Sequence, residues 1–147
     1  MRTLSLYLDN CSYNRPFDSQ AQMRIRLETE AKLYIQANIR AGLYSLCWSY
    51  INDWENTANP YEDRKKSIAP WKTIADTFCP PANDIVSTGR ELMGYGIKAK
   101  DALHIACAIK SGCDYVITTD EKLINKNITA IKIVNPIDFV REMESIS

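Results

Sequence analysis

Short runs of apolar residues alternate along the chain with longer stretches in which apolar residues recur every three or four positions. The short runs predict buried strands, and the longer stretches predict amphipathic helices. Because helical stretches separate the strands, right-handed crossovers and a mostly parallel sheet with helices on both faces are expected. The pattern therefore predicts an α/β fold of three layers. The expected strands cover residues 4–8, 43–47, 115–118 and 131–134.

The expected helices begin and end at residues that commonly flank helices. The longest runs from Ser19 to about Arg40, with Asp18 or Ser19 as N-cap and Gly42 as terminator. A polar loop with Pro16 in its middle is expected between the first strand and this helix. The other helical stretches are expected at residues 49–59, from 59 towards 78, at 83–93, 98–111 and 121–125, and from residues 135 and 136 onward.

The stretch that follows Asn59 carries the signals of a helix start. Asn59 can act as the cap, Pro60 suits the first helical position, and Glu62 suits the capping-box position. Pro70 is expected to kink or split this helix, because proline lacks a backbone N–H and collides with the preceding turn. The CPPAN segment that begins at Cys79 is expected to form a short turn.

Length and composition limit the domain count and the location of the protein. A chain of 147 residues with 46% hydrophobic content predicts a single domain over residues 1–147 with a sizeable core. Asp9 interrupts the first apolar stretch too early for a signal peptide, and no run of about 18 apolar residues occurs. The five cysteines form neither a CxxC pair nor a zinc-site spacing, so each is expected to be a small buried hydrophobe. We therefore expect a cytoplasmic protein with reduced cysteines and no membrane contact.

The charges balance, with 18 basic and 18 acidic residues. Without a net field, a polyanionic substrate has to be met by a local basic patch. Arg15 is one candidate, because it could hold a phosphate bidentately or instead pair with Asp18 and order the loop. The basic cluster Arg64, Lys65 and Lys66 is expected to be a solvated helix face.

Four acidic residues carry the main chemical signal. Asp9 follows the first expected strand, Glu55 lies on the helix after the second, Asp101 heads a helix, and Asp120 follows a later strand. Such positions fall at the carboxyl edge of a parallel sheet, where open α/β folds build their sites. If the four carboxylates converge, a cation must offset their repulsion, and oxygen ligands favour Mg²⁺ or Mn²⁺. Alternatively, Asp101 and Asp120 could simply cap helices.

The chain offers no other obvious catalytic apparatus. It contains no GxSxG elbow, no GxxxxGK[ST] loop and no GxGxxG motif. Its only histidine, His104, is expected to form structural hydrogen bonds rather than to act in catalysis. A metal-assisted attack of water on a phosphodiester needs no nucleophilic side chain, and it therefore fits these residues best.

The order LYLDN, then INDWEN, then KAKDALHIACAIKSGCDYVITTDEKL resembles the PIN domain family of metal-dependent nucleases, which includes toxin ribonucleases of bacterial toxin–antitoxin pairs. The resemblance implies a parallel sheet with a carboxylate cluster at its rim, dependence on Mg²⁺ or Mn²⁺, and cleavage of RNA. It places Asp9, Glu55, Asp101 and Asp120 at the family's acidic positions. It also implies an antitoxin as a protein partner and a homodimer. Trp48, Trp54 and Trp71 are expected at core positions of helices or strands rather than in a base-stacking platform, and they could also furnish a dimer surface.

Two other functions remain open from the sequence. The residues after Asp9 are Asn10 and Cys11, where many PIN domains have a small hydroxyl residue and then asparagine. This difference and the zero net charge motivate a catalytically silent module that binds RNA or protein. A metal-dependent phosphatase acting on a small phosphate ester is a third possibility.

Overall fold

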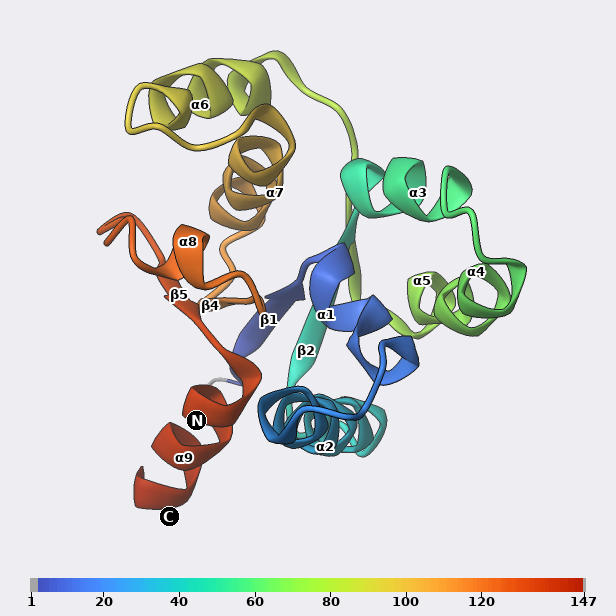
Figure 1. Ribbon diagram of the computed structural model, residues 1–147. Coiled ribbons are helices and arrows are strands. Elements are labelled where there is room, and N and C mark those ends of the chain that lie inside the picture. Colours follow the sequence, from blue (N-terminus) through green and yellow to red (C-terminus); the bar gives the residue numbers. More distant parts are fainter. Residues whose placement is uncertain (1–2, 147) are drawn as a thin grey trace.

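The computed structural model describes residues 3–146, and within them the strands form one five-stranded sheet (Figure 1). The strand order is β3-β2-β1-β4-β5, and all four pairings are parallel. The expected α/β architecture with a parallel central sheet and flanking helices is therefore confirmed. The strands are β1 (Ser5–Leu8), β2 (Ser45–Ser49), β3 (Thr77–Cys79), β4 (Tyr115–Ile117) and β5 (Lys132–Val134).

Four of these strands lie where the apolar runs predicted them, although β2 begins and ends two residues later than expected. The edge strand β3 was missed, because its segment was assigned to the end of a helix and to a turn. It has only three residues, and two of them are exposed. Its pairing with β2, in which Phe78 lies opposite Trp48, depends on tertiary contacts that a local pattern does not report.

Helices flank the sheet, and the longest of them differs from its prediction at the start. The helix α2 begins at Met23, and Gln22 occupies the N-cap without a side-chain hydrogen bond, so the caps proposed at Asp18 and Ser19 are wrong. Gly42 has a positive φ of 81° just beyond the helix, as expected of a terminator. The helical elements are α1 (Asn10–Asn14), η1 (Arg15–Phe17), α2 (Met23–Arg40), α3 (Tyr50–Thr57), α4 (Glu62–Ile68), α5 (Pro70–Ile74), α6 (Asn83–Met93), α7 (Ala99–Lys110), α8 (Glu121–Ile124) and α9 (Pro136–Ile146).

Two local predictions need correction. The segment expected to be a polar loop after β1 forms α1 and the 3₁₀ turn η1, because Asp9 caps α1 by accepting a hydrogen bond from the Ser12 N–H. The helix expected from Asn59 begins at Glu62, since Asn59 accepts instead from the Tyr61 N–H in a local turn. Pro70 splits this stretch into α4 and α5 as expected, and α5 ends at residue 74 rather than near residue 78.

The core lies on both faces of the sheet. On one face Tyr7, Cys47 and Val116 pack against α6 and α7, and on the other Leu8 and Trp48 pack against α2 and α9 (Figure 1). This alternation along β1 and β2 buries both faces, as is usual for parallel strands between helical layers. The ends of β1, β2 and β4 therefore form a rigid edge for the residues that follow them.

The cysteines and tryptophans only partly follow their expected burial. Cys11 is exposed on α1, whereas the other four cysteines are buried as expected. Trp48 and Trp71 belong to the core, but Trp54 is 62% exposed, so the expectation of a core position was wrong for it. Among residues 3–146, no helix is long and apolar enough to cross a membrane.

Candidate active site

The fold carries the four predicted acids to the carboxyl edge of neighbouring strands. Asp9 directly follows β1, and Glu55 lies on α3, which begins at the end of β2. Asp120 follows β4 and Asp101 lies in the first turn of α7. Because β2, β1 and β4 are adjacent and parallel, their ends meet at one rim, and residues far apart in the chain come together there.

Burial and the neighbouring acids raise the pKa values of Asp101 and Asp9. The pKa of Asp101 is raised by burial first and then by Asp120 and Glu55, while His104 opposes the rise. The pKa of Asp9 is raised mainly by burial, with Asp101 adding to it. The rim therefore concentrates negative charge.

Cys11 lies among all four acids. The pKa of its thiol is raised well above the usual range, first by Asp9, then by burial, and then by the other three carboxylates, Asp101, Glu55 and Asp120. A thiol in such a field stays protonated and is a poor nucleophile. Cys11 is therefore a neutral neighbour of the acids.

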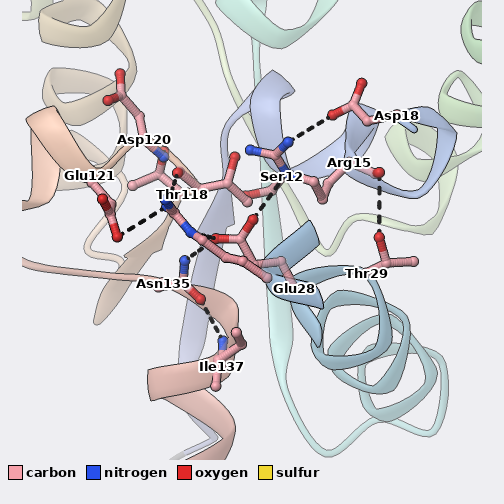
Figure 2. Close-up of polar contacts among 12 residues, drawn as sticks. Ser12, Arg15, Asp18, Glu28, Thr29, Thr118, Asp120, Glu121, Asn135 and Ile137 are labelled. Carbon is pink, nitrogen blue, oxygen red and sulfur yellow. Dashed lines mark hydrogen bonds and ion pairs between the residues drawn. The ribbon is translucent and has the colours of Figure 1, made fainter. Parts of the chain in front are cut away.

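Asp9 is held in place by two donors. It is 3% exposed, its Oδ1 accepts from the Ser12 N–H at 3.0 Å, and its Oδ2 accepts from the Thr118 hydroxyl at 2.5 Å. The Thr118 Oγ1 also accepts from the N–H of Asp120 at 3.1 Å, so one hydroxyl connects the first and fourth acids. Figure 2 shows Thr118 beside Asp120 at the end of β4. The orientation of Asp9 therefore depends on the strand next to its own.

Glu55 and the nearby Asp53 have different partners and therefore different roles. Asp53 accepts from the indole N–H of Trp48 at 2.7 Å and pairs with Lys72 at 2.8 Å, which is a structural role at the base of α3. Glu55 instead contacts His104, with 2.5 Å between Oε1 and Nε2. Of the two acids on α3, Glu55 is the one coupled to the rim.

His104 forms hydrogen bonds through both ring nitrogens, as expected for a structural role. Its Nε2 contacts Glu55, its Nδ1 contacts the hydroxyl of Tyr7, and the ring is 2% exposed. The Tyr7 hydroxyl also contacts the Ser49 hydroxyl at 2.6 Å. A buried chain of polar groups thus connects β1 and β2 through α7 to Glu55.

The alternative that an acid simply caps a helix is wrong for Asp101 and correct for Asp120. Asp101 is the third residue of α7, whose N-cap is Lys98, and its carboxylate has no hydrogen bond or ion pair within the part of the chain that the structure describes. The cap alternative is therefore wrong for Asp101. For Asp120 it is confirmed, since its Oδ1 accepts from the N–H groups of Lys122 and Leu123 at 3.0 and 3.4 Å.

The chemistry of these side chains fits a hard divalent cation. They offer carboxylate oxygens only, and Asp101 has both of its oxygens free of hydrogen bonds. Among residues 3–146, however, no three His, Cys, Asp or Glu side chains are packed closely enough to form a metal-binding group. Asp9, Asp120 and Glu55 direct oxygens to protein donors instead. The side chains are therefore of the kind that bind a hard divalent cation. Because they are not packed closely enough, cation binding requires the carboxylates to move closer together.

Two cavities open beside the acids, and basic residues line both. One, of about 390 Å³, contains Asp101 and Asp120. The other, of about 300 Å³, contains Glu55. A local group of cations of this kind is what a polyanion requires. The sequence did not predict most of these basic residues as neighbours of the acids, because they lie on separate elements. The basic residues are Lys98, Lys122 and Lys126 in the first cavity and Lys100 and Arg64 in the second.

Arg15 is held by acidic side chains. Its Nη1 lies 3.0 Å from Asp18, and its Nε lies 3.2 Å from the fully buried Glu28 on α2 (Figure 2). Of its two proposed roles, the pairing with Asp18 is therefore present, and phosphate binding stays a prediction. Arg64, expected on a solvated face, also pairs with Asp18 at 3.1 Å.

Thr118→Val is expected to weaken both the fold and the site. Valine keeps the shape but removes the hydroxyl that Asp9 and the Asp120 N–H share, which costs about 1–3 kcal/mol. Urea denaturation measures that loss. Thr119→Val is the matched control, since its hydroxyl takes part in no hydrogen bond within residues 3–146. Equal stability of the two variants would show that the Thr118 hydroxyl does not support Asp9.

Comparison with known proteins identifies the family of the chain. A protein-family model, the PIN domain, matches residues 18–128, which is well over half of the 147 residues. The chain therefore belongs to the PIN domain family. A search of curated proteins finds no match.

The same fold occurs in a solved toxin–antitoxin complex. A chain in the crystal structure of VapBC2 from Rickettsia felis, bound to a DNA fragment from its promoter, superposes with a TM-score of 0.56 at 14% identity. The alignment covers 90% of this chain and 98% of that chain. At this identity the similarity establishes the fold.

Proposed function

We propose that the protein is a Mg²⁺- or Mn²⁺-dependent endoribonuclease that hydrolyses RNA phosphodiesters at the rim formed by β2, β1 and β4. The observation that carries the proposal is the position of Asp9, Glu55, Asp101 and Asp120 beside the carboxyl ends of three adjacent parallel strands. Membership in the PIN domain family supports it. Water is the nucleophile, because the thiol of Cys11, which lies among the acids, stays protonated.

Each acid has a role that follows from its surroundings. Asp101 is a principal cation ligand, because its carboxylate makes no hydrogen bonds to protein donors. Asp9 is the second, held in place by Thr118. Asp120 offers its remaining oxygen, and Glu55, oriented by His104, positions the cation or accepts a proton from the attacking water. A bound divalent cation supplies the Lewis acidity for hydrolysis.

The basic residues in the two cavities bind the substrate backbone. Lys98, Lys122 and Lys126 line the cavity with Asp101 and Asp120, and Lys100 and Arg64 line the cavity with Glu55. A strand that crosses the rim places its phosphates against both groups, with one phosphodiester over the carboxylates. Because these contacts are electrostatic, affinity for RNA should fall as salt concentration rises.

We also propose that the protein is the toxin of a toxin–antitoxin pair. The support is the common fold with a chain of the VapBC2 complex. An antitoxin would block cleavage by covering the acidic rim. Co-expression with the product of the adjacent open reading frame, followed by co-purification, tests this part separately.

The enzymatic proposal is tested by incubating the purified protein with a panel of single-stranded and structured RNAs. Cleavage is expected with Mn²⁺ or Mg²⁺, and none is expected after addition of EDTA. Cleavage that continues in EDTA, or that occurs at the same rate in Asp101→Asn, contradicts the proposal.

A catalytically silent RNA-binding module is the second candidate. It is favoured by the lack of a closely packed metal-binding group among residues 3–146. In that case the protein binds RNA oligomers without cutting them in either cation. Turnover of a generic phosphomonoester in the same assay would instead point to a phosphatase.

A further inference from the structure

A third cavity lies away from the acids, between α2 and the segments on its inner side. It has a volume of about 350 Å³ and is lined by α1, η1, α2, α4 and α5. This volume is within the range of small-molecule sites, which combine apolar walls with a few polar groups. It shares no lining residue with the cavity around Asp101.

The polar groups of this cavity lack partners. The hydroxyl of Tyr13 and the amide Nε2 of Gln36 are buried, and neither forms a hydrogen bond within residues 3–146. Lys32 is 4% exposed, and it makes no ion pair in the same part of the chain. Its ammonium lies 5.5 Å from the centroid of the Tyr13 ring. Two buried donors without an acceptor and one unpaired lysine with a largely buried side chain therefore surround one cavity.

Leaving such groups unsatisfied is costly. A buried donor without a partner costs about as much as a lost hydrogen bond, and a buried unpaired charge costs more. Burial alone lowers the pKa of Lys32 to about 7. An anion in the cavity would remove these penalties by accepting hydrogen bonds and balancing the charge.

The apolar side chains of the other walls indicate what the uncharged part of the ligand should be. Ile68 and Trp71 are buried core residues, and Phe17 lies at the opening. Arg40 is exposed and stacks over the Trp71 ring at 4.7 Å, which places its charge outside the buried part. One buried cation beside an apolar wall matches a monoanion on an apolar body better than a multiply charged, fully hydrated phosphate.

We propose that this cavity binds a small organic acid, whose carboxylate pairs with Lys32 and accepts from Gln36 and Tyr13 while its apolar body contacts Ile68 and Trp71. The 3₁₀ turn η1, which connects α1 to α2, forms one wall of this site. The site is separate from the RNA-cleaving rim, and its occupancy does not depend on the proposed nuclease activity.

Calorimetric titration of the full-length protein with hexanoate, 1-hexanol and inorganic phosphate tests the proposal. Hexanoate should bind saturably, and hexanol should bind at least tenfold more weakly because it lacks the charge. Lys32→Met should weaken hexanoate binding at least tenfold, and Gln36→Leu should weaken it severalfold. Lys110→Met, which makes the same charge change on the opposite face of the sheet, should leave it unchanged.

Three results with hexanoate or hexanol overturn the proposal. They are the absence of saturable hexanoate binding up to roughly 10 mM, equal binding of hexanol and hexanoate, and equal binding of hexanoate to Lys32→Met and to the unmodified protein. Phosphate binding that survives in Lys32→Met belongs to the basic cavities at the rim and shows an adventitious ion only, and phosphate binding lost in that variant contradicts the choice of a carboxylate.

Stability measured against pH gives an independent readout. Burial lowers the pKa of Lys32 in the folded protein to about 7 from the usual lysine value of 10.5, so the unfolded chain binds more protons between these two pH values. Unfolding should therefore become harder as pH rises from 7 to 9, by up to about tenfold in the equilibrium constant per pH unit. Among the other lining groups, Tyr13 stays neutral in this range, because burial raises the pKa of its hydroxyl well above the usual value.

The Lys32→Met variant should lack this rise, and hexanoate should reduce it in the unmodified protein by keeping the ammonium charged. Methionine removes the buried charge at similar volume, so the variant is expected to fold. Identical pH profiles of the two proteins would contradict the burial of an unpaired Lys32.

Discussion

Asp101→Asn is expected to reduce RNA cleavage at least about 100-fold, because it removes several kcal/mol of cation-dependent stabilisation of the transition state. The fold should stay intact. The Asp101 carboxylate has no hydrogen bond to lose among residues 3–146, and burial followed by Asp120 raises its pKa. Removing its charge relieves repulsion at the rim, so the free energy of unfolding without metal should stay the same or increase.

Asp138→Asn is a matched control for this variant. Asp138 is also the third residue of a helix, α9, and it is exposed and lines neither cavity beside the acids. Its substitution should leave cleavage unchanged and cost a few tenths of a kcal/mol from the helix dipole. Single-turnover cleavage and urea denaturation of both variants separate catalysis from stability. Loss of activity that only follows unfolding would remove Asp101 from the site.

Asn52→Leu is expected to destabilise the fold by about 3 kcal/mol, because it leaves several buried polar groups without partners. Asn52 is fully buried at the start of α3. Its Oδ1 accepts from the Ser49 N–H at 2.9 Å, and its Nδ2 donates to the Leu8 carbonyl at 3.1 Å and to the Asn10 Oδ1 at 2.9 Å. This amide joins the ends of β1 and β2.

Urea denaturation measures the expected loss, with Asn38→Leu as the control. Asn38 lies on α2, is partly exposed, and has no side-chain hydrogen bond within residues 3–146, so its substitution should cost less than about 0.5 kcal/mol. If Asn52→Leu costs no more than the control, the amide does not hold the two strand ends together. RNA cleavage by the folded Asn52→Leu variant should also fall, because Asp9 directly follows β1 and Glu55 lies on the helix that begins at the end of β2.

The sequence predicted the central strands because burial on both sides produces recognisable apolar runs. Leu6, Tyr7 and Leu8 are all fully buried, and the run over β1 was correspondingly clear. The edge strand β3 was missed because Thr77 and Phe78 are exposed and the strand exists only through its pairing with β2. The five-residue helix α1 was missed because one cap at Asp9, rather than a periodic pattern, starts it.

The positions of the acids could be predicted from topology, but their surroundings could not. Strand ends in a parallel sheet share one edge, so Asp9 and Asp120 could be assigned to it from their places in the chain. Their connection through Thr118, and the contact of Glu55 with His104, depend on side chains 109 and 49 residues apart. Local patterns carry no information on such pairs. The unpaired Lys32 was missed for the same reason, since α2 buries it against separate elements.

Calorimetric titration of Mn²⁺ tests the central proposal most directly, namely that the acids at the rim bind a divalent cation for RNA hydrolysis. The unmodified protein is expected to bind Mn²⁺ saturably, and Asp9→Asn and Asp101→Asn are each expected to weaken that binding about tenfold or more. Asp138→Asn should bind as the unmodified protein does. Absence of Mn²⁺ binding, or binding of equal strength in all four proteins, would contradict the proposed site.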